Sequence, residues 1–213
     1  LPEALSNYMA FLGWSPKSAD REILTLDEIS EIFDLSDINK AGAKFSWEKL
    51  NWINSQYIKN MESIKLSEIM KQYWDENFWE PPSQEWAYKL AILLRDSMTL
   101  LKDAIDQSKP FFLIPTIQKE GQDFLENKDS KASLKLILNY LTEQNIKKLD
   151  KEKAKEIINE ISKNHNVKKG ILMKSLRVAF FGSLSGPDLI QSWELFSEIK
   201  TDRSRIERCL KST

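Results

Sequence analysis

Apolar residues recur at spacings of three and four positions through most of this chain, which is the period of an α-helix. Thr25 and Glu28 stand at the spacing of a capping box ahead of apolar residues, so a short helix is predicted to begin between them. Ser46 is placed to cap a second helix, in which apolar and aromatic side chains over 47–58 share one face. Between these helices, residues 34–42 are predicted to form a loop.

The same period continues further along the chain, with interruptions. Helices are predicted over about 67–74 and over 84–107, the second ending before Pro110 because proline disfavours helical conformation in the residue before it. Another helix is predicted to start near Leu134, and helical patterns dominate from there to residue 213. The sequence therefore predicts an all-α fold.

Three stretches interrupt the helical periodicity. Pro81 with Pro82 and the polar segment 118–133 are candidate domain boundaries. The stretch 182–188 is predicted to be a loop that brings Pro187 to the first position of a helix over 189–199, where the missing N–H of proline costs nothing.

Composition excludes several classes of protein. The chain has 213 residues, of which 41% are hydrophobic and 30% are charged, so we expect a folded core and not a disordered tail. No apolar run approaches the roughly 20 residues that cross a membrane. The one cysteine, Cys209, fits a reducing compartment. We therefore expect a cytoplasmic protein with no membrane partner.

Positive charge is concentrated in the C-terminal part of the chain. The formal net charge is −1, but residues 1–85 carry 8 basic and 15 acidic side chains, whereas residues 86–213 carry 23 and 17. Residues 147–177 alone carry ten basic and four acidic side chains. Such asymmetry in a nearly neutral chain is a hint of a polyanionic partner.

Residue types for catalysis or metal binding are scarce. No closely spaced glycines form a phosphate cradle, and one histidine with one cysteine cannot supply a zinc site. His165 lies in a polar helix end or loop and is predicted to be solvated, and Cys209 is predicted to be an inert small residue near a frayed end. The sequence therefore predicts no catalytic residue and no metal site.

Basic and aromatic residues remain as candidate functional chemistry. Lys and Arg neutralise phosphate, and aromatic and Arg side chains stack on unpaired bases, so this mixture suits RNA loops. In the alternative interpretation the basic segment is a solvated helical face, the tryptophans belong to the core, and the protein is a non-enzymatic helical scaffold for other proteins. A third interpretation, a free-standing enzyme built on carboxylates, predicts turnover by this chain alone.

Three segments resemble the bacterial-type glutamyl-tRNA synthetase family, in the order in which the family carries them. LPEALSNYMAFLGW at 1–14 is similar to the stretch after the family's lysine loop, and FSWEKLNWINSQYI at 45–58 is similar to its stem-contact segment. LRVAFFGSLSGPDL at 176–189 is similar to its C-terminal anticodon-binding segment. The resemblance is weak over 110–165, and the family's two ATP-site motifs, a His-x-Gly-His type motif and the lysine loop, have no counterpart in this sequence.

This resemblance implies the C-terminal portion of a ligase. It implies a stem-contact helical domain over 1–80, followed by an α-helix-cage anticodon-binding domain in two subdomains, 81–122 and 123–213. The portion would bind tRNA(Glu) as a monomer, would not bind DNA, and would be inactive alone. Glutamate ligation with ATP and magnesium would belong to the parent enzyme's catalytic domain, and whether tRNA(Gln) is also accepted is left open.

The resemblance also implies five anticodon-binding positions, which are Arg95, Arg177, Gly186, Pro187 and Leu189. Arg95 aligns with an arginine that distinguishes the third anticodon base in some members. In the alternative interpretation it is a surface arginine near Asp96 or Asp103. Gly186 departs from members with a hydroxyl residue there, which leaves backbone groups of the loop to contact bases.

Overall fold

The computed structural model describes residues 1–16, 21–39 and 42–211. These ranges contain twelve α-helices, one 3₁₀ helix and one isolated bridge between Trp14 and Ile38, so the all-α prediction is confirmed. The chain divides into two compact units, and α5 (Gln84–Arg95) and α6 (Asp103–Phe112) contribute residues to both. None of the helices in the described residues combines the length and hydropathy of a membrane-spanning segment.

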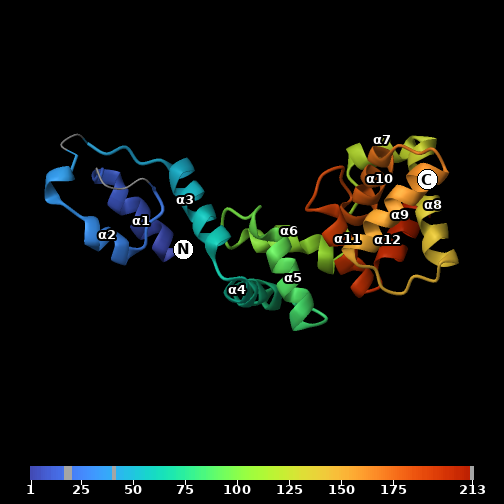
Figure 1. Ribbon diagram of the computed structural model, residues 1–213, viewed down its shortest axis with the longest axis horizontal. Coiled ribbons are helices and arrows are strands. Elements are labelled where there is room, and N and C mark those ends of the chain that lie inside the picture. The colour runs from blue at the N-terminus through green and yellow to red at the C-terminus, as the bar shows by residue number, and fades with distance from the viewer. Residues whose placement is uncertain (17–20, 40–41, 212–213) are drawn as a thin grey trace. The chain divides into compact units, whose positions relative to one another are not determined.

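The first compact unit comprises residues 1–78 and 94–106. Its own helices are α1 (Pro2–Gly13), α2 (Leu26–Ile32), the 3₁₀ helix (Leu35–Asp37), α3 (Trp47–Asn60) and α4 (Ser63–Glu76), which run from blue to blue-green in Figure 1. α1 packs against α3 around Ala4, Tyr8 and Ile53, which are all buried. A smaller cluster, built on Trp14, Leu24 and Ile29, joins α1 to α2.

A buried amide holds the segment between α1 and α2 in place. The Oδ1 atom of Asn7 accepts hydrogen bonds from the Leu24 N–H and from the Tyr57 hydroxyl, both at 3.1 Å. The Nδ2 atom of Asn7 donates to the Glu22 carbonyl at 3.1 Å. Asn7 is 0% exposed, and a polar group so deeply buried is tolerated only when it is hydrogen-bonded. This amide therefore sets where the chain enters α2.

Local sequence patterns predicted two helix starts correctly. The Thr25 hydroxyl accepts from the Glu28 N–H while the Glu28 carboxylate accepts from the Thr25 N–H, which is a complete capping box. Ser46 caps α3 by accepting from the Lys49 N–H at 3.1 Å. α4 begins four residues earlier than the predicted range 67–74. The predicted loop 34–42 contains the 3₁₀ helix, and its residues 40 and 41 lie outside the described residues.

The single helix predicted over 84–107 is wrong, because the chain turns between α5 and α6. The Asp103 carboxylate accepts hydrogen bonds from the backbone N–H groups of Thr99 and Leu100, both at 2.8 Å. An aspartate that takes these N–H groups competes for them with a continuing helix, so α5 does not run on into α6. The turn is also anchored by Met98, which is 1% exposed.

The prediction that a helix ends before Pro110 is also wrong, since Pro110 lies inside α6. Proline cannot donate the helical hydrogen bond expected at this position. The next residue, Phe111, is 1% exposed and stacks on Phe196 with the ring centres 4.9 Å apart. Aromatic packing in the second unit therefore offsets the missing bond.

The second compact unit comprises residues 79–93 and 107–213. Besides its parts of α5 and α6, it contains α7 (Lys119–Glu126), α8 (Lys128–Glu143), α9 (Lys151–Asn164), α10 (Lys169–Phe181), α11 (Leu189–Glu198) and α12 (Asp202–Lys211). α10 packs against α7, α8, α9, α11 and α12, and it is the central helix of this unit (Figure 1). The polar segment 118–133 is helical, because α8 begins six residues before Leu134. The domain boundaries at 80 and 122 stay predictions.

A guanidinium is buried in the core of the second unit. Arg205 of α12 is 1% exposed, and it donates to the carbonyls of Phe180 at 3.0 Å and Leu113 at 3.3 Å. Its guanidinium carbon lies 4.3 Å from the centre of the Phe196 ring. Burial lowers the pKa of Arg205 to about 10, so the side chain stays protonated at neutral pH. The two carbonyls lie at the C-terminal ends of α10 and α6, where the helix dipoles are negative and compensate for the charge.

Asp202→Asn is expected to stabilise the second unit at neutral pH. Asp202 is 5% exposed, and its Oδ2 accepts from Trp193 Nε1 at 3.3 Å. Burial raises the pKa of this carboxyl, so its contribution to stability is complete below the unfolded pKa and is lost as pH rises through the folded pKa. The amide keeps an acceptor without the charge, so we expect a gain of about 1 kcal/mol at pH 7 that disappears at pH 3. Urea unfolding of both proteins at the two pH values measures this gain, and a gain that is equal at both would contradict the assignment.

Candidate functional site

Three of the five positions implied by the resemblance lie in or at the end of the connection between α10 and α11, which we call the 182–188 loop. Gly182 follows α10 with a φ of 69°, a left-handed conformation that glycine adopts without steric penalty. Asp188 caps α11 by accepting from the Gln191 N–H at 2.9 Å. Pro187 therefore precedes the cap, and the prediction that it is the first helical residue is wrong, because the Asp188 carboxylate takes the capping role.

Arg177 of α10 holds the second half of this loop. Its Nη1 atom donates to the carbonyls of Gly186 at 3.0 Å and Pro187 at 2.9 Å. Its Nε and Nη2 atoms carry the other three N–H groups, and no acceptor among the described residues takes them. The structure thus brings three of the predicted residues together and leaves Arg177 with donors for a ligand.

The first half of the loop is held from α7, through contacts that sequence reasoning missed. The Ser183 hydroxyl and the Leu184 N–H both donate to Oε1 of Glu120, at 2.7 Å and 3.3 Å. The Gln118 N–H donates to the Gly182 carbonyl at 2.8 Å. Glu120 and Ser183 are 63 positions apart, and no local pattern in the sequence marks their contact.

Two glycines allow the loop to lie against its neighbours. A Cβ atom added at Gly182 would lie 2.2 Å from the Thr116 carbonyl oxygen. Gly186 has a φ of 154°, and an added Cβ would lie 2.7 Å from the Phe181 ring. Because no side chain fits at Gly186, any contact that this residue makes with a ligand goes through its backbone.

Backbone donors are available at the end of the loop. Leu189 is 1% exposed as a whole residue, so it belongs to the core, and the contact with the anticodon predicted for it stays a prediction. The N–H groups of Gly186 and Ile190, which are exposed and half-buried residues, meet no acceptor among the described residues. Free N–H groups at a helix start bind acceptor or anionic groups well, because the helix dipole adds to each hydrogen bond.

Exposed lysines lie near the end of α9 and along α10, the helix that precedes this loop. They are Lys163, Lys168, Lys169 and Lys174, and within the described ranges none of them forms an ion pair with a carboxylate. Lys174 is one helical turn from Arg177 and therefore lies on the same face of α10. Uncompensated positive charge of this kind attracts phosphate.

Arg95 lies in the first unit, at the end of α5, with its side chain 28% exposed. Its Nη1 atom donates to the Ser63 hydroxyl at 3.3 Å, and its Nε atom lies 3.9 Å from an oxygen of Asp96. Asp96 is exposed, and an ion pair of this length with an exposed carboxylate is worth about 0–1 kcal/mol, so it holds the guanidinium only weakly. The other carboxylate expected near Arg95, that of Asp103, accepts backbone N–H groups instead.

The lone histidine lies where it was predicted, whereas the position predicted for the lone cysteine, near a frayed end, is wrong. His165 is exposed at the C-terminal end of α9. Cys209 is fully buried, and burial raises the pKa of its thiol, which makes it a poor nucleophile. It belongs to the core of α12 and not to a frayed end.

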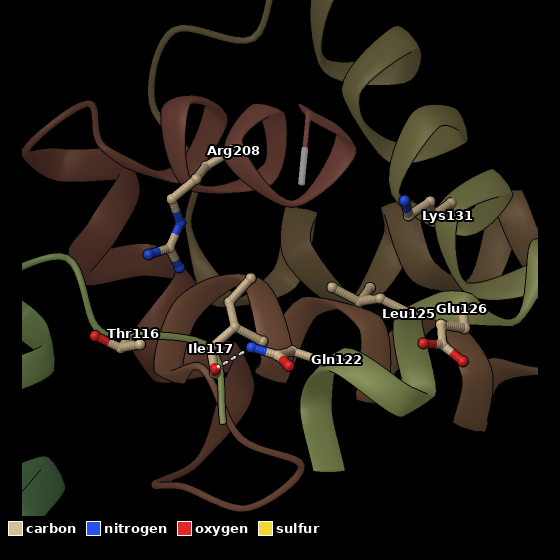
Figure 2. A pocket seen from close by; sticks show the side chains of 7 residues that line it. All are labelled: Thr116, Ile117, Gln122, Leu125, Glu126, Lys131 and Arg208. Carbon is tan, nitrogen blue, oxygen red and sulfur yellow. Dashed lines mark hydrogen bonds between the residues drawn. The ribbon is translucent and has the colours of Figure 1, made fainter. Parts of the chain in front are cut away.

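A pocket of about 590 Å³ is lined by residues of α7, α8, α12 and the segment before α7 (Figure 2). Its lining residues are Thr116, Ile117, Gln122, Leu125, Glu126, Lys131 and Arg208. Figure 2 shows Arg208 and Lys131 approaching it from opposite sides, and Gln122 Nε2 donating to the Ile117 carbonyl at 3.0 Å. The pocket shares Thr116 with the contact surface of Gly182, so the segment that supports the loop also forms a wall of this pocket.

Comparisons with known proteins find an anticodon-binding family model and relatives that are glutamate–tRNA ligases. A family model described as "Anticodon binding domain" matches residues 65–210. A glutamate–tRNA ligase of Prochlorococcus marinus strain AS9601 is 88% identical over 210 residues, which cover 99% of this chain and 44% of that protein. A glutamate–tRNA ligase of strain NATL2A is 46% identical over 208 residues, with 98% and 44% covered. The chain thus spans less than half the length of these relatives.

Solved structures give the same fold. The structure of a glutamate tRNA ligase from Elizabethkingia meningosepticum matches with a TM-score of 0.91 and 30% identity, and the match covers 100% of this chain and 41% of that one. A glutamate-tRNA synthetase from Elizabethkingia anophelis matches with a TM-score of 0.85 and 32% identity over the same shares.

Proposed function

This chain belongs to the anticodon-binding domain family, and from that premise we propose that it binds tRNA(Glu) and reads its anticodon as part of a glutamate–tRNA ligase. The resemblance of the three sequence segments to glutamyl-tRNA synthetases is confirmed by these relatives. Because the chain spans 44% of the relatives' length, glutamate ligation with ATP and magnesium is proposed for the whole protein only. We place that protein in the cytoplasm and expect a monomer.

The observation that carries this proposal is the 182–188 loop, held by Arg177, with the exposed Lys174 one helical turn away. Exposed lysines neutralise phosphates whatever the base sequence, so they supply affinity and orientation. Specificity needs fixed donors at base edges, and the free N–H groups of Arg177 and of the Gly186 backbone are such donors. An unpaired anticodon exposes base edges that a single strand offers and a duplex hides.

Parts of the first unit are suited to other regions of the same tRNA. Trp47 and Trp52 of α3 are 68% and 45% exposed, although large aromatic side chains are usually covered in a folded protein. We propose that this unit contacts the tRNA stem and that Arg95 contacts the third anticodon base. The guanidinium of Arg95 can donate hydrogen bonds to the acceptor atoms of cytosine. Discrimination at this base would decide whether tRNA(Gln) is rejected.

The proposal is tested by measuring binding of this chain to a tRNA(Glu) transcript and to the same transcript with a changed anticodon, over a series of salt concentrations. We expect tighter binding to the first transcript and a linear fall of log K with log salt for both. A helical scaffold for proteins would show neither effect. Binding that ignores both the anticodon and the salt concentration would refute the proposal.

Arg95→Ala is expected to reduce discrimination at the third anticodon base. Loss of one base-edge contact should weaken binding of tRNA(Glu) about tenfold, while a transcript with guanine in place of the third base should bind as before. The Arg95 side chain contributes one hydrogen bond, to the Ser63 hydroxyl, so circular dichroism should show unchanged helicity. Equal losses for the two transcripts would mean that Arg95 contributes only general charge.

A further inference from the structure

We propose that Glu120 is a positioning residue for the 182–188 loop, and that its carboxyl oxygen, not its negative charge, sets the conformation in which the loop meets the anticodon. The tRNA part of this inference rests on the proposed function. The part that concerns the loop itself does not.

One oxygen atom of Glu120 organises the first half of the loop. Its Oε1 accepts from the Ser183 hydroxyl at 2.7 Å and from the Leu184 N–H at 3.3 Å. The Ser183 oxygen in turn accepts from the Ser185 N–H at 3.2 Å and lies 3.1 Å from the Ser185 hydroxyl. A chain of hydrogen bonds therefore runs from α7 through Ser183 to the exposed Ser185.

The second half of the loop is held by a cation, since Arg177 donates to the carbonyls of Gly186 and Pro187. Glu120 accepts from donors of the loop, and Arg177 donates to its acceptors. Glu120 thus holds residues 183 and 184, Arg177 holds residues 186 and 187, and neither side chain contacts the groups that the other binds. Releasing Glu120 should free residues 183–185 while Arg177 still holds residues 186 and 187.

The charge of Glu120 opposes the proposed ligand. The side chain is exposed, and a carboxylate beside a bound polyanion lowers the affinity through repulsion between like charges. Its hydrogen bonds raise the affinity, because a loop that is already ordered loses less conformational entropy on binding. The two effects have opposite signs, so a substitution that removes one and keeps the other separates them.

Glu120→Gln removes the charge and keeps the hydrogen bonds, because both bonds go to the same oxygen, which the amide retains. Glu120→Ala removes the oxygen and the charge together. Asp123→Ala is the matched control, since Asp123 lies on the same helix and forms an ion pair with the exposed Lys119, with Nζ and Oδ1 2.7 Å apart. All three variants of the full chain are compared with the unmodified protein.

Two measurements are made on each protein. Hydrogen exchange of the Leu184 amide is followed without RNA, and binding is measured with a tRNA(Glu) transcript and its changed-anticodon form. For Glu120→Ala we expect about tenfold faster exchange and about fivefold weaker binding of tRNA(Glu), with the changed transcript unaffected or bound more tightly. Glu120→Gln should keep the slow exchange and bind tRNA(Glu) as well as or better than the unmodified chain. Asp123→Ala should behave like the unmodified chain in exchange.

Several outcomes would overturn the inference. If Glu120→Gln and Glu120→Ala change exchange and binding alike, the charge is the active feature. If Glu120→Ala leaves the Leu184 exchange unchanged, or if Asp123→Ala speeds it equally, Glu120 does not position the loop. An unmodified chain without anticodon preference would refute the proposed function, and the exchange data would still decide the role of Glu120.

Discussion

Gly182→Ala lowers the free energy of unfolding of the second unit by about 3 kcal/mol, because a left-handed alanine is strained and its Cβ overlaps a neighbouring backbone atom. The overlap is with the Thr116 carbonyl oxygen, 2.2 Å from the added Cβ, and a backbone atom cannot turn aside as a side chain does. The chain must therefore shift at the 182–188 loop or at residue 116. Urea unfolding measures the loss.

Gly170→Ala is the matched control for this substitution. Gly170 lies in the first turn of the same helix, α10, and an added Cβ meets nothing within 4 Å. We expect this variant to be as stable as the unmodified chain or more stable by up to about 1 kcal/mol, because alanine is the better helix former. A Gly182→Ala protein whose stability matches that of Gly170→Ala would show that the loop accommodates a side chain, which the geometry does not allow.

Arg177→Ala weakens binding of tRNA(Glu) about 30-fold, which corresponds to about 2 kcal/mol. The loss has two sources, since the variant frees the carbonyls of Gly186 and Pro187 and also removes the donors on Nε and Nη2. Charge-assisted hydrogen bonds of this kind are worth about 1.5–3 kcal/mol each before the loop relaxes. Binding titrations at one fixed salt concentration measure the effect.

Lys174→Ala distinguishes a loss of affinity that depends on the anticodon from a loss that any tRNA would show. Lys174 lies one turn from Arg177 on the same face and forms no ion pair with a described residue, so its removal takes away charge alone. We expect it to weaken binding of tRNA(Glu) and of the changed-anticodon transcript equally, by about threefold. Arg177→Ala should affect mainly tRNA(Glu). If both variants reduce binding of both transcripts in the same proportion, Arg177 has no part in reading the anticodon.

Features that depend on neighbouring residues were predictable from the sequence. The capping box of Thr25 and Glu28 and the Ser46 cap are formed by residues three apart, and the helices they start were predicted correctly. The turn between α5 and α6 was missed because the apolar period continues across it. What ends α5 is the Asp103 carboxylate together with burial of Met98, and periodicity does not report either.

The site was predictable to the extent that a local motif carries it. The segment 176–189 identified Arg177, Gly186 and Pro187, which the structure brings together. The support from Glu120 could not be predicted, since it joins residues 63 positions apart and depends on how α7 lies against α10. Gly182 could be recognised as a helix end, but its closeness to Thr116 is a property of the tertiary structure alone.

The buried guanidinium of Arg205 has a consequence for how the second unit loses its structure. Detaching α12 alone would strip the Phe180 and Leu113 carbonyls of their donors and the Phe196 ring of its cation. Keeping α12 while α6 or α10 frays would strand a charge in an apolar core. Both partly unfolded forms are therefore high in free energy. We expect α6, α10 and α12 to unfold in one cooperative step, so that the surface carrying the 182–188 loop is lost together with them.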